Sequence, residues 1–139
     1  MKTFLYWLVS LTWGGIMTFI GLCAALGMLI TFHKPHRYGH AIYFESRKKG
    51  WGGVNLGAVF IVSKGSGDGV KSHEYGHSFQ NIFYGIGHVG ISIASFTRYW
   101  YRVYLEKKYP FRKLPPYDSV WFEAQATEWG MKYSPFKIN

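Results

Sequence analysis

The pentapeptide HEYGH, residues 73–77, is the most informative stretch of this 139-residue chain. Two histidines four positions apart on a helix lie one above the other on the same face, so the imidazoles of His73 and His77 can bind one tetrahedral metal ion. Glu74 stands between them and points beside that ion, where a carboxylate can take a proton from an activated water molecule. The pattern therefore predicts a metal site with hydrolytic chemistry.

The sequence around this motif predicts a helix and a small sheet. The run KGSGDG of residues 64–69 is a turn, and Asp68 is a suitable N-cap for a helix over residues 70–83. The stretches AIYFES (residues 41–46) and VNLGAVFIVS (residues 54–63) are rich in β-branched and aromatic residues. Both are bounded by glycine or charge clusters, so we expect two strands.

A catalytic zinc site needs a third protein ligand and an open position for water. The continuation HExxHxxGxxH is absent, because Gln80 stands where the glycine belongs and Phe83 where the third histidine belongs. The remaining source of a ligand is a carboxylate on a second helix. We expect such a helix over residues 119–129, ended by Gly130, and it carries Glu123 in the stretch WFEAQAT.

The combination of HExxH with ExxA, here the residues EAQA that begin at Glu123, resembles the gluzincin clan of zinc metallopeptidases. The resemblance implies His73, His77 and Glu123 as zinc ligands and Glu74 as general base and acid. One turn after the ligand glutamate, many members of the clan carry an aspartate that orients a ligand histidine. Here that residue is Thr127, an uncharged hydrogen-bond partner.

The region of residues 51–130 also resembles small bacterial membrane-anchored metallopeptidase-like proteins, and its compact scheme resembles the minigluzincins. This resemblance implies that the strand over residues 54–63 forms the upper rim of the cleft and pairs with an extended peptide. The reaction also needs a donor to the oxyanion. For that role the sequence offers three candidates, which are His88, Tyr117 and Tyr133.

The N-terminal part of the chain is apolar. No charged side chain lies between Lys2 and Lys34. A single helix over the uncharged residues 4–32 would be about 43 Å long, more than the roughly 30 Å hydrocarbon core of a bilayer. A cleaved signal peptide has a shorter apolar region, so we expect a retained transmembrane helix over residues 1–33. Residues 34–139 then form a zincin-like metallopeptidase domain.

Positive charge follows this apolar part and predicts the orientation of the chain. The basic residues after it are Lys34, Arg37, Arg47, Lys48 and Lys49. Under the positive-inside rule they predict that the C-terminal domain is in the cytoplasm, and the resemblance to small bacterial proteins implies the bacterial cytoplasmic membrane. A second apolar segment covers residues 82–97. A single crossing there would separate His77 from Glu123, so we expect a helix that re-enters or packs against the membrane.

The composition excludes several other classes of protein. Sixteen Lys and Arg against seven Asp and Glu give a formal charge of +9, while 48% hydrophobic residues argue against disorder. Cys23 is the only cysteine, so an intramolecular disulfide and a cysteine zinc cage are both excluded. We expect no nucleic-acid partner, because no nucleic-acid motif accompanies the basic residues and they follow a long apolar run.

The sequence thus predicts an α+β membrane protein with an N-terminal transmembrane helix, a small sheet, an active-site helix and a glutamate-bearing helix. Its expected function is zinc-dependent hydrolysis of peptides or proteins near the lipid bilayer. Two alternatives stay open. One is a membrane-anchored binding or structural module in which any metal only ties two helices together. The other is a peripheral adaptor that uses the basic and aromatic surface of residues 98–113. The oligomeric state also stays open.

Overall fold

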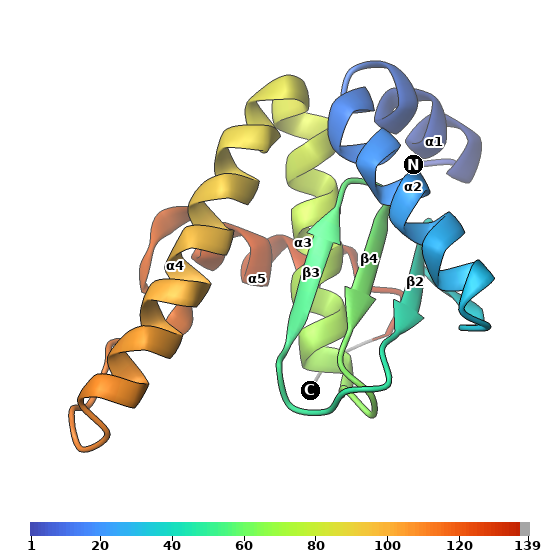
Figure 1. The fold of residues 1–139 in the computed structure, drawn as a ribbon. Coiled ribbons are helices and arrows are strands. Elements are labelled where there is room, and N and C mark those ends of the chain that lie inside the picture. Colours follow the sequence, from blue (N-terminus) through green and yellow to red (C-terminus); the bar gives the residue numbers. More distant parts are fainter. Residues whose placement is uncertain (137–139) are drawn as a thin grey trace.

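The computed structural model describes residues 1–136 and has an α+β fold, as predicted, in which helices surround a small mixed sheet (Figure 1). The helices are α1 (Thr3–Thr12), α2 (Gly15–Ile30), α3 (Asp68–Tyr84), α4 (His88–Lys108) and α5 (Trp121–Tyr133). Short 3₁₀ turns are η1 (Gly85–Gly87) and η2 (Tyr117–Ser119). The strands are β1 (Pro35–Tyr38), β2 (Ala41–Glu45), β3 (Gly53–Leu56) and β4 (Val59–Val62).

The strands lie in the order β1-β2-β4-β3, with β2 and β4 parallel and the other two pairs antiparallel. The prediction of a strand at residues 41–46 is confirmed by β2. The prediction of one strand over residues 54–63 is wrong, because the chain reverses at Gly57 to form the β3–β4 hairpin. Gly57 has a φ of +74°, a backbone conformation that glycine adopts without steric cost. The reversal makes β3 an edge strand.

Helix α3 covers one face of the sheet with an aromatic core. Tyr75 of α3 is buried in one cluster with Tyr43 of β2 and Phe60 of β4. The rings of Tyr43 and Phe60 stack with their centroids 5.4 Å apart, since the parallel register places these two residues side by side. This core determines the distance between α3 and the sheet, and therefore the position of the HEYGH motif relative to the strands.

Helix α2 packs on the opposite face of the sheet. Side chains alternate along a strand, so Val59 faces away from the side on which its neighbour Phe60 meets α3. A Cβ atom on Gly21 of α2 would lie 2.1 Å from the carbonyl oxygen of Leu56 and 3.1 Å from Cβ of Val59. The absence of a side chain at Gly21 therefore lets α2 rest directly on the β3–β4 hairpin.

The predicted single helix over residues 1–33 is instead two helices, α1 and α2, bent by 105°. Among residues 1–136 no one helix combines the length and apolar character needed to cross a bilayer; α1 and α2 satisfy that test only when taken together. The bend is held by Asn81 of α3, whose Nδ2 donates to the carbonyl oxygen of Gly14 at 3.3 Å and to Oγ1 of Thr18 at 3.2 Å. A Cβ atom on Gly14 would lie 2.2 Å from that Nδ2. A side chain of α3 thus fills the inside of the bend.

The second apolar segment, residues 82–97, is not one helix. It contains the end of α3, the turn η1 and the first half of α4. Gly85, with a φ of +55°, ends α3 and reverses the chain. The chain therefore turns back after α3. A metal site shared by His77 and Glu123 requires such a turn, because the two residues lie on either side of this segment in the sequence.

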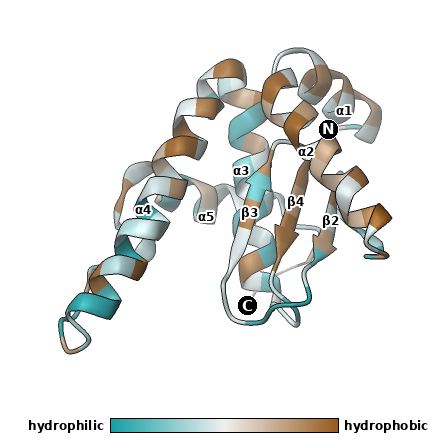
Figure 2. Cartoon of the chain, viewed as in Figure 1, coloured by the Kyte–Doolittle hydropathy of each residue, from teal (hydrophilic) through white to brown (hydrophobic). Residues whose placement is uncertain are grey.

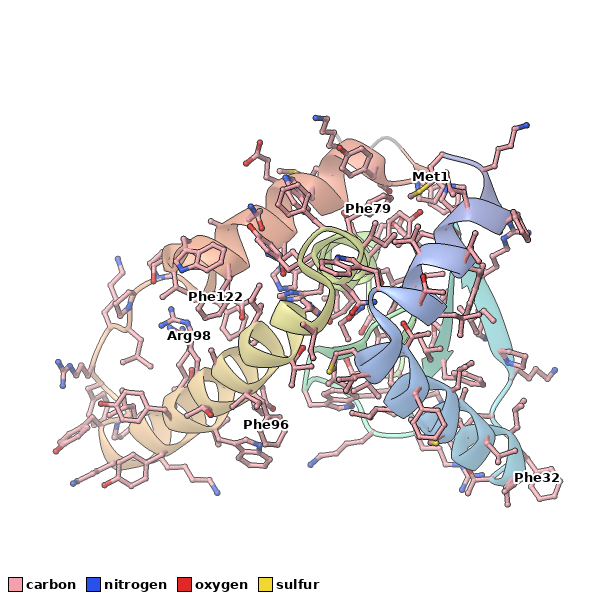
Figure 3. All side chains as sticks on the ribbon, turned by 90° about the horizontal axis from the view of Figure 1, so that it is seen from above. Met1, Phe32, Phe79, Phe96, Arg98 and Phe122 are labelled. Atoms are coloured by element: carbon pink, nitrogen blue, oxygen red, sulfur yellow. The ribbon has the colours of Figure 1, made fainter. Side chains whose placement is uncertain are left out.

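Two arginines of α4 bind the segment that leads into α5. Arg98 donates to the carbonyl oxygens of Pro116 and Tyr117, and Arg102 donates to the carbonyl oxygen of Pro115 at 2.6 Å. The side chain of Arg98 points from α4 towards this segment (Figure 3). Two of the basic residues in the surface of residues 98–113 therefore form hydrogen bonds within the chain.

Candidate metal centre

Two glycines let α3 and α5 approach closely. A Cβ atom on Gly76 of α3 would lie 1.8 Å from the carbonyl oxygen of Ala126, and one on Gly130 of α5 would lie 2.0 Å from the carbonyl oxygen of Ser72. The two helix backbones are therefore in direct contact. The prediction that α5 ends at Gly130 is wrong, because the helix continues to Tyr133. Its small size serves the packing of the two helices instead.

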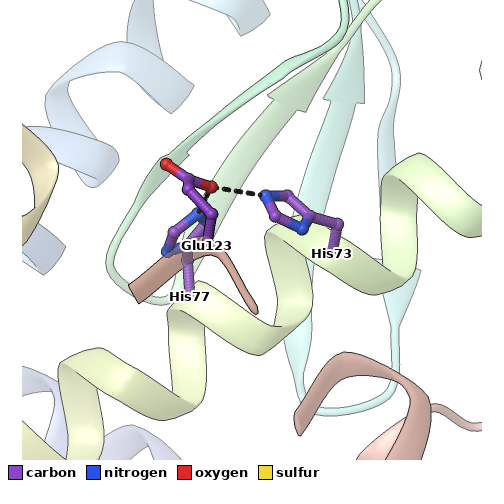
Figure 4. A group of neighbouring side chains, drawn as sticks. All are labelled: His73, His77 and Glu123. Atoms are coloured by element: carbon purple, nitrogen blue, oxygen red, sulfur yellow. Dashed lines mark hydrogen bonds and ion pairs between the residues drawn. The ribbon is translucent and has the colours of Figure 1, made fainter. Parts of the chain in front are cut away.

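This contact places the three predicted ligands around one point (Figure 4). Oε2 of Glu123 is 3.0 Å from Nε2 of His73 and 3.3 Å from Nε2 of His77, and the three ligand atoms all lie within 4.8 Å of one another. A tetrahedral ion with bonds of about 2.0–2.1 Å separates its ligand atoms by roughly 3.3 Å. Two imidazoles and one carboxylate at these distances could hold a metal ion.

Hydrogen bonds orient both imidazoles so that Nε2 faces the carboxylate. Nδ1 of His77 lies 2.7 Å from Oε1 of Gln80, and Nε2 of Gln80 donates to the carbonyl oxygen of Phe122 at 2.7 Å. An amide oxygen only accepts, so Nδ1 of His77 carries a proton, and Nε2 is the nitrogen that faces the carboxylate and could bind a metal ion. Nδ1 of His73 pairs with Oγ1 of Thr127 at 2.9 Å, in the place where the resemblance implied a hydrogen-bond partner.

The second oxygen of Glu123 is held from α4, since Oγ of Ser95 donates to Oε1 of Glu123. Glu123 is fully buried. Burial by itself would raise the pKa of this carboxyl, but the hydrogen bonds from His73, His77 and Ser95 outweigh it and hold the pKa well below its usual range. Glu123 is therefore ionised at neutral pH, as a metal ligand must be.

The predicted general base, Glu74, lies beside the ligands and lines the cavity described below. A Cβ atom on Gly53 of the edge strand would lie 2.7 Å from Cγ and Oε1 of Glu74, so a larger residue there would require this carboxylate to move. Glu74 is 6% exposed. Burial, with a further contribution from the charge of Glu123, raises the pKa of Glu74 to about 7. A carboxyl with that pKa exchanges protons readily at neutral pH.

A cavity of about 720 Å³ opens in front of the ligands, between β3 on one side and α4 on the other. Its walls are mostly apolar and include residues from α2, β3 and α4, among them Met17, Ile20, Leu56, Ile93, Phe96 and Trp100. The rim is formed by the edge strand β3, residues 53–56, and not by the whole of residues 54–63 as the sequence predicted. Only the first strand of the hairpin can therefore pair with a further chain.

The three candidate oxyanion donors lie in different places. Tyr117 lines the cavity, with its ring 6.2 Å from that of His73. His88 is 1% exposed, has its ring 6.1 Å from that of His77, and has no hydrogen-bond partner for either nitrogen within residues 1–136. Tyr133 stacks on Phe79 at 4.3 Å and is not among the residues that line the cavity. Of the three, Tyr117 alone is among the residues that line the cavity, whereas His88 is buried next to His77 without lining it, and Tyr133 packs on Phe79.

Several residues of the centre were not recognised in the sequence as functional. Gln80 could have been found, because positions i and i+3 on a helix are neighbours and it follows His77 at that spacing. Gly76 lies inside the motif itself, yet only the packing of α5 gives it a role. For Ser95 the sequence holds no signal, since it comes from a third helix with no motif.

Comparison with protein-family models, with curated proteins and with solved structures found no match to this chain. The resemblance to gluzincins stays a prediction that depends on the motifs HExxH and ExxA. The geometry described above, a His-His-Glu group that could hold a metal ion, is what the structure adds to it.

Proposed function

We propose that this protein is a zinc-dependent peptidase of the gluzincin type. The observation that carries the proposal is the meeting of His73, His77 and Glu123 at mutual distances suited to one tetrahedral ion, beside a cavity that both histidines and an edge strand line. Nitrogen and oxygen ligands in this combination suit zinc. The buried Glu74 beside them supplies the base that hydrolysis needs.

Bound zinc would lower the pKa of a water molecule and polarise the scissile carbonyl. The residues of the chain then have separate roles. Glu74 takes the proton that leaves the attacking water and passes it to the departing amine, a role that its pKa of about 7 suits. Thr127 and Gln80 hold the two imidazoles in the orientation that presents Nε2.

Two neutral side chains near the ligands are the candidate donors to the oxyanion. Burial raises the pKa of Tyr117, so its phenol stays protonated at neutral pH and can donate. Burial lowers the pKa of His88 to about 3, so its imidazole is neutral at pH 7 and keeps one N–H to donate. Both side chains therefore remain uncharged near pH 7.

The edge strand β3 supplies a place for the substrate. Among residues 1–136, its backbone is paired only on the side of β4, so an extended peptide can add to the free edge through backbone hydrogen bonds. Glu74 lies directly beside Gly53 of this strand. A peptide held there would therefore pass next to the base and the three ligands.

We also infer that the enzyme works at the bacterial cytoplasmic membrane, on the cytoplasmic side, where its substrates are peptides or proteins near the bilayer. Support for this part comes from the uncharged residues 4–32 and the cations that follow them.

The test is metal analysis together with hydrolysis of a mixed library of quenched fluorescent peptides. We expect about one zinc per chain in wild type and a large loss of zinc in Glu123→Ala. Glu128→Ala is the matched control, because Glu128 is an exposed residue of the same helix. Glu74→Gln should keep its zinc and lose a factor of about 10²–10⁴ in turnover.

The same experiment separates the proposal from its alternatives. A chain that holds one zinc and unfolds when the zinc is removed, yet cleaves nothing in the library, is a structural or binding module. A chain purified without chelators that contains no zinc contradicts the proposal and favours an adaptor.

A further inference from the structure

Two apolar turns lie side by side at one end of the molecule (Figure 1). One joins α1 to α2, and the other joins α3 to α4. Nε1 of Trp13 in the first turn donates to the carbonyl oxygen of Phe83 at the end of α3, at 3.4 Å. A Cβ atom on Gly85 would lie 2.4 Å from the ring of Trp13. The two turns therefore form one surface.

We call this surface, with the first turns of α2, the apolar cap. Its members are Trp13, Ile16, Phe19, Phe83 and Ile86, which are between 49% and 68% exposed. The outward sides of α1 and α2 continue it with further exposed apolar residues, which are Leu5, Leu8, Leu11, Leu22, Leu26 and Leu29. Figure 2 shows many hydrophobic residues on α2 and on the first turns of α4 at this end, in contrast to the far end of α4.

The exposed apolar area is larger than a monomeric soluble protein usually leaves open. Side chains of this number and exposure present on the order of 1,000 Å², against about 300–600 Å² for the largest patch of a typical monomer. Residues 3–33 contain no Asp, Glu, Lys or Arg, and neither do residues 75–97, which contain the second turn. Some apolar phase or partner therefore covers this surface.

Arginine side chains bind both free ends of the bent helix pair formed by α1 and α2. At the start of α1, Nη2 of Arg37 donates to Oγ1 of Thr3 at 3.0 Å. At the end of α2, Nη2 of Arg47 donates to the carbonyl oxygen of Thr31 at 3.0 Å. These arginines belong to β1 and to the residues just after β2, two neighbouring strands. Both ends of the pair are thus tied to the sheet, while the bend is tied to the end of α3.

We propose that the apolar cap and the outward sides of α1 and α2 insert into one leaflet of an anionic membrane, with the bend foremost, and that the chain leaves the leaflet on the side from which it entered. An apolar surface edged by cations matches acyl chains edged by anionic headgroups. A second copy of the chain fits less well, because pairing the same faces would bring like arginines together. This inference refines the membrane attachment in the proposed function and is independent of peptidase activity.

The first test is flotation of the full-length protein with vesicles of phosphatidylcholine alone or with 30% phosphatidylglycerol. Wild type should float, more strongly with the anionic lipid. Phe19→Asp and Ile86→Asp, both at exposed positions of the apolar cap, should each weaken partition at least about tenfold. Phe111→Asp is the matched control, since Phe111 is fully exposed beyond the end of α4, and it should float like wild type. Thermal unfolding of each variant checks that the fold is retained.

The second test is labelling of single cysteines with a membrane-impermeant maleimide. In a Cys23→Ala background, Lys2→Cys and Lys34→Cys mark the two ends of the bent pair. In right-side-out and inverted membrane vesicles from expressing cells, both positions should react in the same preparation. Reaction in opposite preparations would show that the pair crosses the membrane and would overturn the proposal. A wild type that does not float, but forms a dimer that Phe19→Asp dissociates, would overturn it as well and assign this face to a second copy.

Discussion

Substitution of Gly76 by alanine tests the connection between the packing of α3 on α5 and the candidate metal centre. The added Cβ would lie 1.8 Å from the carbonyl oxygen of Ala126, whereas real Cβ contacts essentially never fall below 3.0 Å. A backbone oxygen cannot move away by changing rotamer, so the two helices must separate locally by more than 1 Å. Overpacking of this kind costs about 1–3 kcal/mol in the free energy of unfolding.

The matched control is Gly69→Ala in the same helix, because a Cβ atom there would have no neighbour within 4 Å. Alanine stabilises a helix by up to about 1 kcal/mol relative to glycine, so this variant should be as stable as wild type or slightly more so. The difference between the two variants should therefore be about 1–4 kcal/mol, measured by urea unfolding.

The same displacement should weaken metal binding. Glu123 lies one turn before Ala126, so a shift of α5 at Gly76 also moves the carboxylate relative to the two imidazoles. We expect zinc affinity to fall by at least about tenfold in Gly76→Ala, as measured by competition with a chromophoric chelator, and to be unchanged in Gly69→Ala. Equal stability and equal zinc affinity in the two variants would refute the argument that direct contact of the helix backbones builds the site.

Three further substitutions test other parts of the structure. Thr127→Val keeps the shape of the side chain but removes the partner of Nδ1 of His73, so zinc affinity should fall by about 10–100-fold, with little change in the melting temperature without metal. The pKa of His88 is lowered to about 3 in the folded state, so the unfolded chain binds more protons between that pH and about 6.5. The free energy of unfolding therefore decreases as the pH falls through this window, by up to about 1.4 kcal/mol per pH unit. His88→Leu should therefore unfold with a flatter dependence on pH, and an unchanged slope in urea titrations at several pH values would contradict the assignment. Asn81→Leu removes the hydrogen bond to the carbonyl oxygen of Gly14 and should cost about 1–3 kcal/mol, whereas a neutral result would mean that Asn81 does not hold the bend.

Local patterns in the sequence predicted the elements whose shape depends on local interactions. The turn before Asp68 and the spacing of the motif predicted α3, and residue type predicted β2. The bend at Gly14 could not be predicted in this way, because its cause, Asn81, is 67 positions further along the chain. The strand β1 was missed for a different reason: its residues are mostly exposed and lack the apolar alternation typical of a strand.

For the candidate centre, the motifs indicated the three ligands because each is tied to a fixed spacing on a helix. His73 and His77 share one face of α3, and Glu123 was recognised through its resemblance to ExxA. What the spacing could not give is the distance between the two helices. That distance depends on glycines at Gly76 and Gly130, and the second of these has the sequence appearance of a helix end.

The contact between α2 and the β3–β4 hairpin has a consequence for biosynthesis. Ribosomes make the chain from its N-terminus, so the apolar residues of α1 and α2 emerge before residues 53–62, on which Gly21 rests. During that interval the nascent chain exposes an uncharged, aggregation-prone segment before the β3–β4 hairpin is available to pack against it. We expect translation of this protein to depend on early capture by a chaperone or by lipid, and folding of the sheet to be completed only after β4 has left the exit tunnel.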